Sequence, residues 1–300
     1  MKGVHSKAYL ALILTCLIWG TTYLVNKLGV TRIPPFFFTS VRQIVSGTII
    51  LVYIFLIKRA PLPSKKYILF QVLLAFLLIT LGNGIGTYGL SYIDSGISAI
   101  LASLSPIIIA LLTIYFRPSD QLSSLGWFGI FLGFVGLIFI CFDKFSWPIG
   151  QNTTAIGFIL TIVSVGAWGV GSVISKTKTY PYSPLMAAGF QMFFGGLPMA
   201  FLCVSFEELS NFSLTKEMFY IWLYLIVMGS LVAYSCYIYA LRHLPATVVS
   251  IQSYINPIIA MFLGYFILNE PFTYRIIYGA IFTLFGVFIL NYSEYRKHKA

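Results

Sequence analysis

The sequence predicts an all-α integral membrane protein with ten transmembrane helices, arranged as two inverted repeats of five helices each. Three observations lead to this prediction: a scarcity of charge, ten long apolar runs and an internal repeat. Only 9% of the 300 residues are charged and 59% are hydrophobic, with a mean hydropathy of +0.90. A soluble domain carries about 25% charged residues. The composition therefore excludes an ordinary soluble enzyme, a disordered chain and a nucleic-acid-binding protein.

Each predicted helix is an apolar run of about 20 residues, the length that crosses a bilayer. The runs are 8–27, 35–57, 67–90, 96–116, 124–142, 154–175, 184–206, 218–240, 245–268 and 272–292. Their continuity favours helices over the strands of a membrane barrel, which alternate over about ten residues. The first run has no small-residue cleavage site, so we expect it to remain as a helix rather than to be removed as a signal peptide.

Basic residues set the predicted orientation. With the N-terminus in the cytoplasm, 13 of the 19 Lys and Arg residues fall on the cytoplasmic side, and six of the eight acidic residues fall on the other side. Cytoplasmic loops of membrane proteins carry such an excess of positive charge. Because topology and contact with anionic lipid explain the net charge of +11, no nucleic-acid partner is expected. Both termini are predicted to be cytoplasmic, in a protein of the inner membrane.

The two halves of the chain resemble each other at an offset of 149 to 151 residues. The matched pairs are Trp19-Gly20 with Trp168-Gly169, Arg42–Gly47 with Gln191–Gly196, Ser105-Pro106 with Asn256-Pro257, and Asp120–Ser123 with Glu270–Thr273. This order predicts one repeat over residues 1–150 and a second over residues 151–300. Because each repeat holds five spans, an odd number, the second enters the membrane upside down. Inverted repeats of this kind are typical of transporters.

The chain resembles the EamA-type ten-helix members of the drug/metabolite transporter superfamily over essentially its whole length. The residues that carry the resemblance are Ile18-Trp19-Gly20-Thr21, the Pro-x6-Arg stretch that ends at Arg42, Ser105-Pro106, Asn256-Pro257 and Leu268-Asn269-Glu270-Pro271. One departure is Asp120, which stands where the family often has a glutamate. The resemblance implies a membrane transporter of metabolites such as amino acids, often moving them outward, and it leaves the substrate open.

Arg42 is the most informative single residue, because it lies about 10 Å into the second span. A charge at that depth is costly unless it is paired or faces water. One interpretation places Arg42 in a central cavity, where its guanidinium forms a bidentate pair with a substrate carboxylate. The alternative is an arginine that snorkels to the interface or binds backbone carbonyls. Its counterpart in the second repeat, Gln191, is neutral, so the two halves would offer one charge and one amide.

Polar and aromatic side chains within the spans complete the predicted binding site. Asn83 and Thr87 share one face of the third span, and Gln252 and Asn256 are again four residues apart in the ninth. Hydroxyl groups on otherwise apolar stretches are added by Tyr88 and Tyr239. Such a lining suits a small amphipathic metabolite. The alternative for each side chain is hydrogen bonding and packing between helices.

Two tryptophans and two prolines occupy equivalent places in the two repeats. Trp19 and Trp168 lie in the middle of the first and sixth spans, whereas tryptophan usually lies at the membrane interface. We expect them to wall or gate the cavity, with core packing as the alternative. Pro106 and Pro257 each remove a backbone hydrogen bond within a span, so they are predicted hinges or fixed kinks.

No cofactor, metal or catalytic residue is predicted. The four cysteines fall within spans at no metal-like spacing, and the three histidines lie outside the spans. No Asp or Glu lies mid-span, so proton exchange through an intramembrane carboxylate is not expected, and facilitated efflux or exchange fits better. The predicted partners are a small-molecule substrate and the lipid bilayer, with the chain acting as a monomer or homodimer.

Several functions remain open at this stage. An exporter of amino acids is favoured, since aromatic walls and one arginine suit a zwitterion with an apolar side chain. An importer or exchanger of a nucleoside-like or cofactor-like metabolite is the alternative, because alternating access is reversible. An intramembrane enzyme is disfavoured because motifs such as H-E-x-x-H and G-x-S-x-G are missing. A structural scaffold would not need buried polar pairs at mirrored sites.

Overall fold

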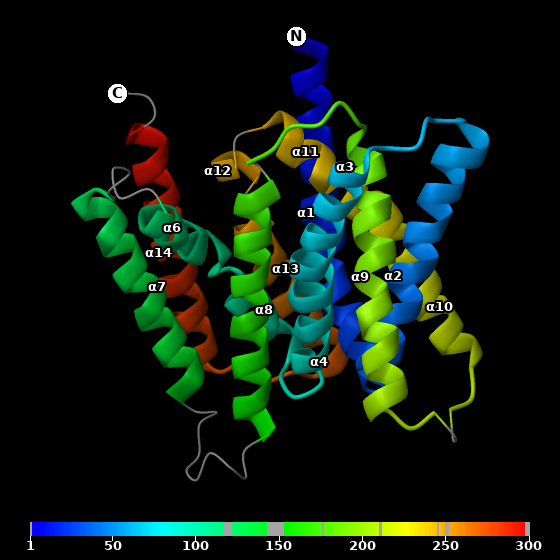
Figure 1. The fold of residues 1–300 in the computed structure, drawn as a ribbon. Helices are drawn as coiled ribbons and strands as arrows, with labels where there is room; N and C mark the ends of the chain where they lie inside the picture. Colours follow the sequence, from blue (N-terminus) through cyan, green and yellow to red (C-terminus); the bar gives the residue numbers. More distant parts are fainter. Residues whose placement is uncertain are drawn as a thin grey trace.

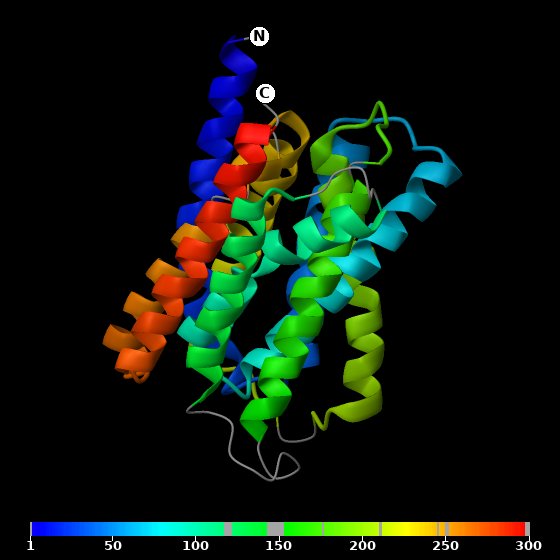
Figure 2. The ribbon, with the colours of Figure 1, turned by 90° about the vertical axis from the view of Figure 1, so that its left-hand side faces the viewer.

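The computed structural model describes residues 2–116, 122–142, 153–175, 177–209, 212–244, 246–249 and 252–297. Within these ranges the regular structure is helical and no strand occurs. Asp120, one of the residues matched between the two halves, lies outside the described residues. Both ends of the described chain, the start of α1 and the end of α14, lie at the same end of the bundle (Figures 1 and 2).

The predicted ten-helix membrane fold is confirmed. The elements of the first half are α1 (Lys2–Val30), α2 (Pro35–Val52) with η1 (Tyr53–Ile57), α3 (Lys65–Leu74) with η2 (Ala75–Ile85) and α4 (Gly86–Leu90), α5 (Ser95–Ala102), α6 (Ser105–Phe116) and α7 (Ser124–Phe142). Those of the second half are α8 (Thr153–Ser175), α9 (Pro184–Phe206), α10 (Lys216–Tyr224) with η4 (Leu225–Tyr234) and α11 (Ser235–His243), α12 (Ala246–Val249), α13 (Gln252–Leu268) and α14 (Tyr274–Lys297). Among the described residues, eight helices are long and apolar enough to cross a membrane, and two shorter apolar helices occupy Ser124–Phe139 and Gln252–Leu268.

The third and eighth spans each contain a π-helical segment at the same place. Residues 75–85 form η2 and residues 225–234 form η4, which is an offset of about 150 residues. A π-helical turn is wider than an α-helical one and is found frequently at functional sites. The internal repeat therefore extends to an unusual backbone feature that the residue matches alone did not predict.

Local sequence explains where several spans begin. Ser64, Ser183 and Thr215 each stand just before a helix, and each side-chain oxygen accepts a hydrogen bond from the backbone N–H three residues later. These are N-caps, which satisfy one of the free N–H groups of the first turn. Pro35 and Pro184 open α2 and α9, where a missing N–H costs nothing.

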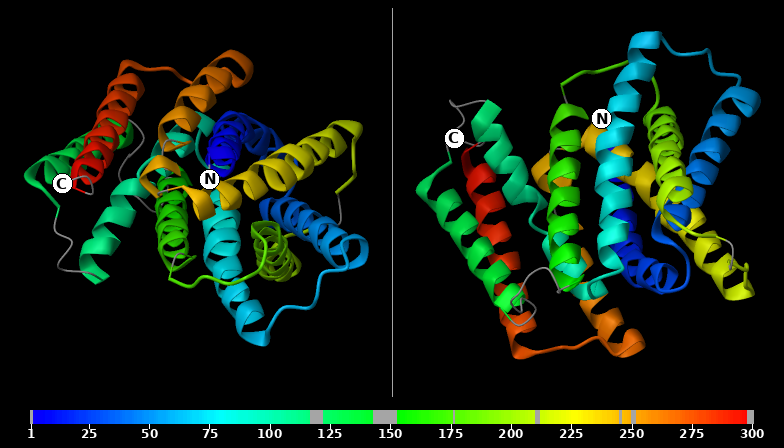
Figure 3. Two further views of the ribbon diagram at one scale, coloured as in Figure 1. Left: turned by 90° about the horizontal axis from the view of Figure 1, so that it is seen from above. Right: turned by 60° about the horizontal axis from the view of Figure 1, so that its bottom comes forward.

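The two repeats interleave rather than lie side by side as separate bodies. The second span packs on the seventh as α2 on α9, and the fifth packs on the tenth as α7 on α14. Figure 3 shows α7 and α14 together on one side of the bundle and α2 and α9 on the other. In the α7–α14 contact, a Cβ on Gly129 would lie 2.7 Å from the carbonyl oxygen of Gly286, so only glycine allows this approach.

The outer surface of the bundle carries many exposed apolar side chains. On α1 these include Leu10, Ile13 and Leu17, and on α9 they include Phe201 and Val204, which is 85% exposed. A soluble monomer rarely shows contiguous apolar surface on this scale. These faces are therefore the ones that contact lipid.

Candidate functional site

A polar cavity of about 160 Å³ lies between the two repeats. Its walls come from α1, α2, η2, α4, α5, the start of α6, α8, η4 and α13, so both repeats contribute. Seven of the side chains predicted for the binding site line it: Trp19, Arg42, Asn83, Thr87, Trp168, Gln252 and Asn256. Pro257, one of the predicted hinges, lines it as well. The π-helical segments η2 and η4 both reach this cavity, through Asn83 and Ser230.

Arg42 is the charged group of this cavity. Its side chain is only 4% exposed. Its Nε donates to Ser230 Oγ at 2.9 Å and its Nη1 donates to Asn26 Oδ1 at 3.1 Å. Both partners are neutral, and no carboxylate among the described residues pairs with it. Because the guanidinium is charged at any physiological pH, a buried positive charge is left without a counter-charge.

The backbone around Arg42 leaves room for the guanidinium. Gly229 lies beside it, and a Cβ added there would approach the Arg42 Nη2 atom to 3.2 Å. The partner residues Asn26 and Ser230 are 16 and 188 residues away in the chain. Neither was among the predicted binding residues. Their polarity within apolar spans is the signal that could have found them.

Three amide side chains in the cavity wall retain unused hydrogen-bonding capacity. The oxygens of Gln43, Gln252 and Asn256 are buried with no hydrogen-bond partner in the described part of the chain. Gln43 also donates from Nε2 to Asn83 Oδ1 at 2.9 Å, which orients both side chains. A buried acceptor without a partner is costly. Such oxygens suit the ammonium or hydroxyl donors of a bound molecule.

Four aromatic rings form a cluster, and three of them, Trp19, Trp168 and Tyr234, line the cavity. Trp19 and Trp168 meet edge to face with centroids 5.8 Å apart. Tyr234 and Tyr237 complete the cluster, and all six pairs of ring centroids lie between 5.0 and 6.4 Å. The indole N–H of Trp19 donates to the carbonyl oxygen of Gly229 at 3.1 Å, which fixes the ring on η4. Such ring pairs are separately stabilising and therefore hold a defined wall.

The structure places three other predicted binding residues outside this cavity. Tyr88 stacks on Phe36, with centroids 4.7 Å apart, and its hydroxyl accepts from Tyr92. The Tyr239 ring contacts the His243 ring in a tilted arrangement, with centroids 4.3 Å apart, and packs against the buried core. Gln191 is buried in a second location, where it donates to Gln71.

Helix geometry explains why the tyrosines face elsewhere. Thr87, which does line the cavity, directly precedes Tyr88, and consecutive helical residues point about 100° apart. Tyr239 follows the cavity-lining Tyr234 by five residues, which again turns it to another face. Pro106 also lies outside the lining, one residue into α6 after the break that separates α5 from α6.

Charged side chains hold the end of the bundle farthest from the termini. The Glu270 carboxylate accepts from Ser95 N at 2.7 Å, Ser95 Oγ at 2.9 Å and Gly96 N at 3.1 Å, and so caps α5. Asn269, with a φ of 52°, turns the chain so that Glu270 reaches this helix. Lys27 on α1 donates to the carbonyl oxygens of Leu90 and Ile93, in the segment that joins α4 to α5.

Two interleaved inverted repeats around a buried polar cavity are the architecture of a secondary membrane transporter. The sequence profile described as the EamA-like transporter family matches residues 6–142 and again residues 155–292. The chain belongs to this family, and it is a membrane transporter of the drug/metabolite type.

Relatives support the same assignment. The uncharacterized transporter YoaV of Bacillus subtilis (strain 168) is 27% identical over 97% of this chain and 99% of its own length. The uncharacterized inner membrane transporter YedA of Escherichia coli (strain K12) is 28% identical over 85% of this chain and 80% of its own. One crystal structure, 16% identical, superposes with a TM-score of 0.69 over 95% of this chain and 97% of that chain, and therefore shares the fold.

Proposed function

We propose that this transporter moves a small metabolite that carries a carboxylate, with amino acids as the favoured class, by alternating access around the central cavity. The observation that supports this most directly is Arg42, a buried guanidinium that faces the cavity with only neutral partners. A substrate carboxylate supplies the missing counter-charge, and a guanidinium binds it with two parallel hydrogen bonds. The predicted role of Arg42 in substrate binding rests on this geometry.

The amide oxygens extend the proposal from an acid to a zwitterion. Gln43, Gln252 and Asn256 present unpartnered acceptors in the same cavity. An ammonium group has three donors and no acceptor, so it matches this part of the lining. The aromatic rings of Trp19 and Trp168 provide apolar surface for a side chain. A free amino acid has these three features in one molecule.

The cavity volume supports a small substrate. At about 160 Å³ it lies below the roughly 300 Å³ at which pockets for drug-sized ligands begin. An amino acid fits that volume better than a multi-ring drug. Outward transport is the direction that the family resemblance implies, and inner-membrane location follows the name of the relative YedA. The distribution of basic residues supports a cytoplasmic position for both termini.

The test is counterflow in liposomes. The purified full-length chain is reconstituted, loaded in turn with each of the twenty unlabelled amino acids, and assayed for uptake of the same labelled amino acid. We expect a subset with apolar side chains to give counterflow, and empty liposomes to give none. Absence of counterflow with every amino acid, from protein that is monodisperse in detergent, would contradict the proposal.

A further inference from the structure

A second cavity, of about 410 Å³, lies at the end of the bundle that carries both termini. Its walls come from α3, α8, α9 and α11 and from the connection between α8 and α9. No residue of the central cavity is shared with it. Gln191, predicted as a binding residue, lies in this second cavity rather than in the central one.

The second cavity is electropositive. Lys178 and Arg242 stand at its exposed rim, and the described residues that line it include no Asp or Glu. Arg242 donates to the carbonyl oxygen of Tyr182, and Lys178 Nζ lies 5.5 Å from the centroid of the Phe70 ring. These contacts hold both cations at the cavity without neutralising them. A concave surface lined by one sign of charge attracts the opposite charge.

Buried polar groups line the interior. Gln191 donates from Nε2 to Gln71 Oε1 at 2.7 Å, and both amides are almost fully buried. The Tyr67 hydroxyl, in a side chain that is 2% exposed, has no hydrogen-bond partner among the described residues. An unpartnered hydroxyl can donate to a carboxylate oxygen. The cavity therefore combines cations at the rim with an unused donor deeper inside.

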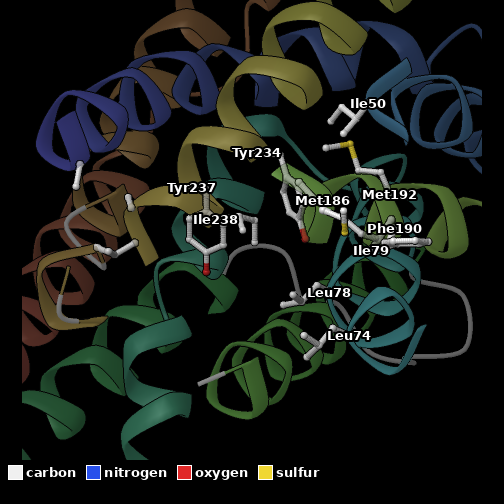
Figure 4. Close-up of a cluster of buried hydrophobic side chains, with 14 of the residues drawn as sticks. Ile50, Leu74, Leu78, Ile79, Met186, Phe190, Met192, Tyr234, Tyr237 and Ile238 are labelled. Carbon is white, nitrogen blue, oxygen red and sulfur yellow. The ribbon is translucent and has the colours of Figure 1, made fainter. Parts of the chain in front are cut away.

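One layer of side chains separates the second cavity from the first. Tyr234 lines the central cavity, and its hydroxyl donates to Gln191 Oε1 at 2.5 Å on the far side. Tyr234 also belongs to the four-ring cluster with Trp19, Trp168 and Tyr237. Figure 4 shows Tyr234 and Tyr237 among buried side chains of η2 and α9. Tyr234, a member of the ring cluster, therefore lies between the two cavities.

The geometry points to the second cavity as a binding site for the carboxylate group of the transported metabolite, on the route between the ring cluster and the terminus-bearing end of the bundle. The inference rests on the proposed function for the identity of the ligand. The positive charge of the second cavity does not depend on that proposed function. Basic residues at this end also fit the topology signal, so the test compares cations that line the cavity with cations that do not.

The test measures charge selectivity at a reporter cysteine. Thr179, which lines the second cavity and is exposed, is changed to cysteine in a background where the four native cysteines are alanine. The reporter is labelled with the anionic sulfonatoethyl and the cationic trimethylammonioethyl methanethiosulfonates. We expect faster labelling by the anion. The double variant Lys178→Gln/Arg242→Gln should lower the anion-to-cation rate ratio by roughly tenfold.

The matched control removes two exposed cations from the same end of the bundle that line neither cavity, Lys7→Gln/Lys58→Gln. We expect it to change the ratio by less than about twofold, because exposed charges beyond about 8 Å are screened. Isocaproate, an acid without an amine, should slow labelling of the reporter, and isoamylamine should not. A ratio that responds equally to both double variants, or equal protection by acid and amine, would overturn the inference.

The two proposals fail separately. If no amino acid gives counterflow, the proposed function is defeated while the charge ratio at the second cavity can still be measured. If counterflow is active and the charge ratio does not depend on Lys178 and Arg242, the second site is defeated and the proposed function remains.

Discussion

Arg42 and Gln191 stand at equivalent places in the two repeats, yet their surroundings differ. Arg42 is buried with two neutral partners and faces a cavity. Gln191 is buried with both ends of its amide bonded, to Gln71 and to Tyr234. A guanidinium without a counter-charge is costly, whereas a bonded amide is not. The difference shows that the repeats share a backbone, while among the described residues only the first repeat places an unpaired charge at the central cavity.

The largest expected effect comes from making the two positions alike. Arg42→Gln keeps hydrogen-bonding groups at the cavity but removes the charge. We expect kcat/KM for counterflow of leucine to fall by about 10- to 100-fold, the value of a lost hydrogen bond to a charged group. The control Arg32→Gln removes a partly exposed arginine that lines neither cavity, and we expect it to lower kcat/KM by less than about threefold, since exposed charges contribute little.

An exchange variant sharpens the comparison. Arg42→Gln/Gln191→Arg keeps composition and net charge, and it moves the guanidinium to the site of Gln71 and Tyr234. We expect no rescue of leucine counterflow beyond the level of Arg42→Gln. Recovery of more than half of the wild-type rate would show that the two positions serve one cavity, as the sequence had predicted.

A smaller effect is expected at the bond between the two cavities. Tyr234→Phe keeps the ring cluster but leaves Gln191 Oε1 buried without a donor. The loss should lower the free energy of unfolding by about 1 to 3 kcal/mol. A thermal-unfolding assay in detergent checks this, with the exposed Tyr274→Phe as the control, for which we expect no change. An unchanged melting temperature in Tyr234→Phe would argue against the hydrogen bond from Tyr234 to Gln191.

The smallest effects concern the charged contacts at the other end of the bundle. Glu270→Gln weakens the cap on α5, and we expect a loss of stability of about 0.5 to 2 kcal/mol. Glu217→Gln removes a largely exposed ion pair with Arg32, and we expect a loss of stability of less than about 1 kcal/mol. Melting temperatures of the two variants, compared in the same detergent, should fall in that order. The reverse order would argue against the capping role of Glu270.

Most of the fold was predictable from the sequence because membrane burial imposes length and composition on every span. The offset of 149 to 151 residues also identified which residues are equivalent. The site was less predictable. Arg42, Trp19 and Trp168 were found because a charge or a tryptophan is unusual at mid-span.

The remaining site residues depend on three-dimensional contacts. Ser230, one of the two partners of Arg42, lies in the eighth span. Nothing in the sequence indicates that the eighth span packs beside the second. Gln191 was predicted for the central cavity by symmetry alone, but the repeats differ in the side chains that surround it. Thr87 and its neighbour Tyr88 were both predicted for the lining, but consecutive helical residues point about 100° apart, and of the two only Thr87 lines the cavity.

Direct binding tests the central claim, that Arg42 is an unpaired charge that selects a carboxylate. Trp19 and Trp168 line the cavity, so their fluorescence reports binding without transport. Isocaproate and isoamylamine are titrated into purified wild-type protein and into Arg42→Gln. We predict that the wild type binds the acid at least about tenfold more tightly than the amine and that Arg42→Gln loses this preference. Equal affinity of the wild type for acid and amine, or a preference that persists in Arg42→Gln, would contradict the claim.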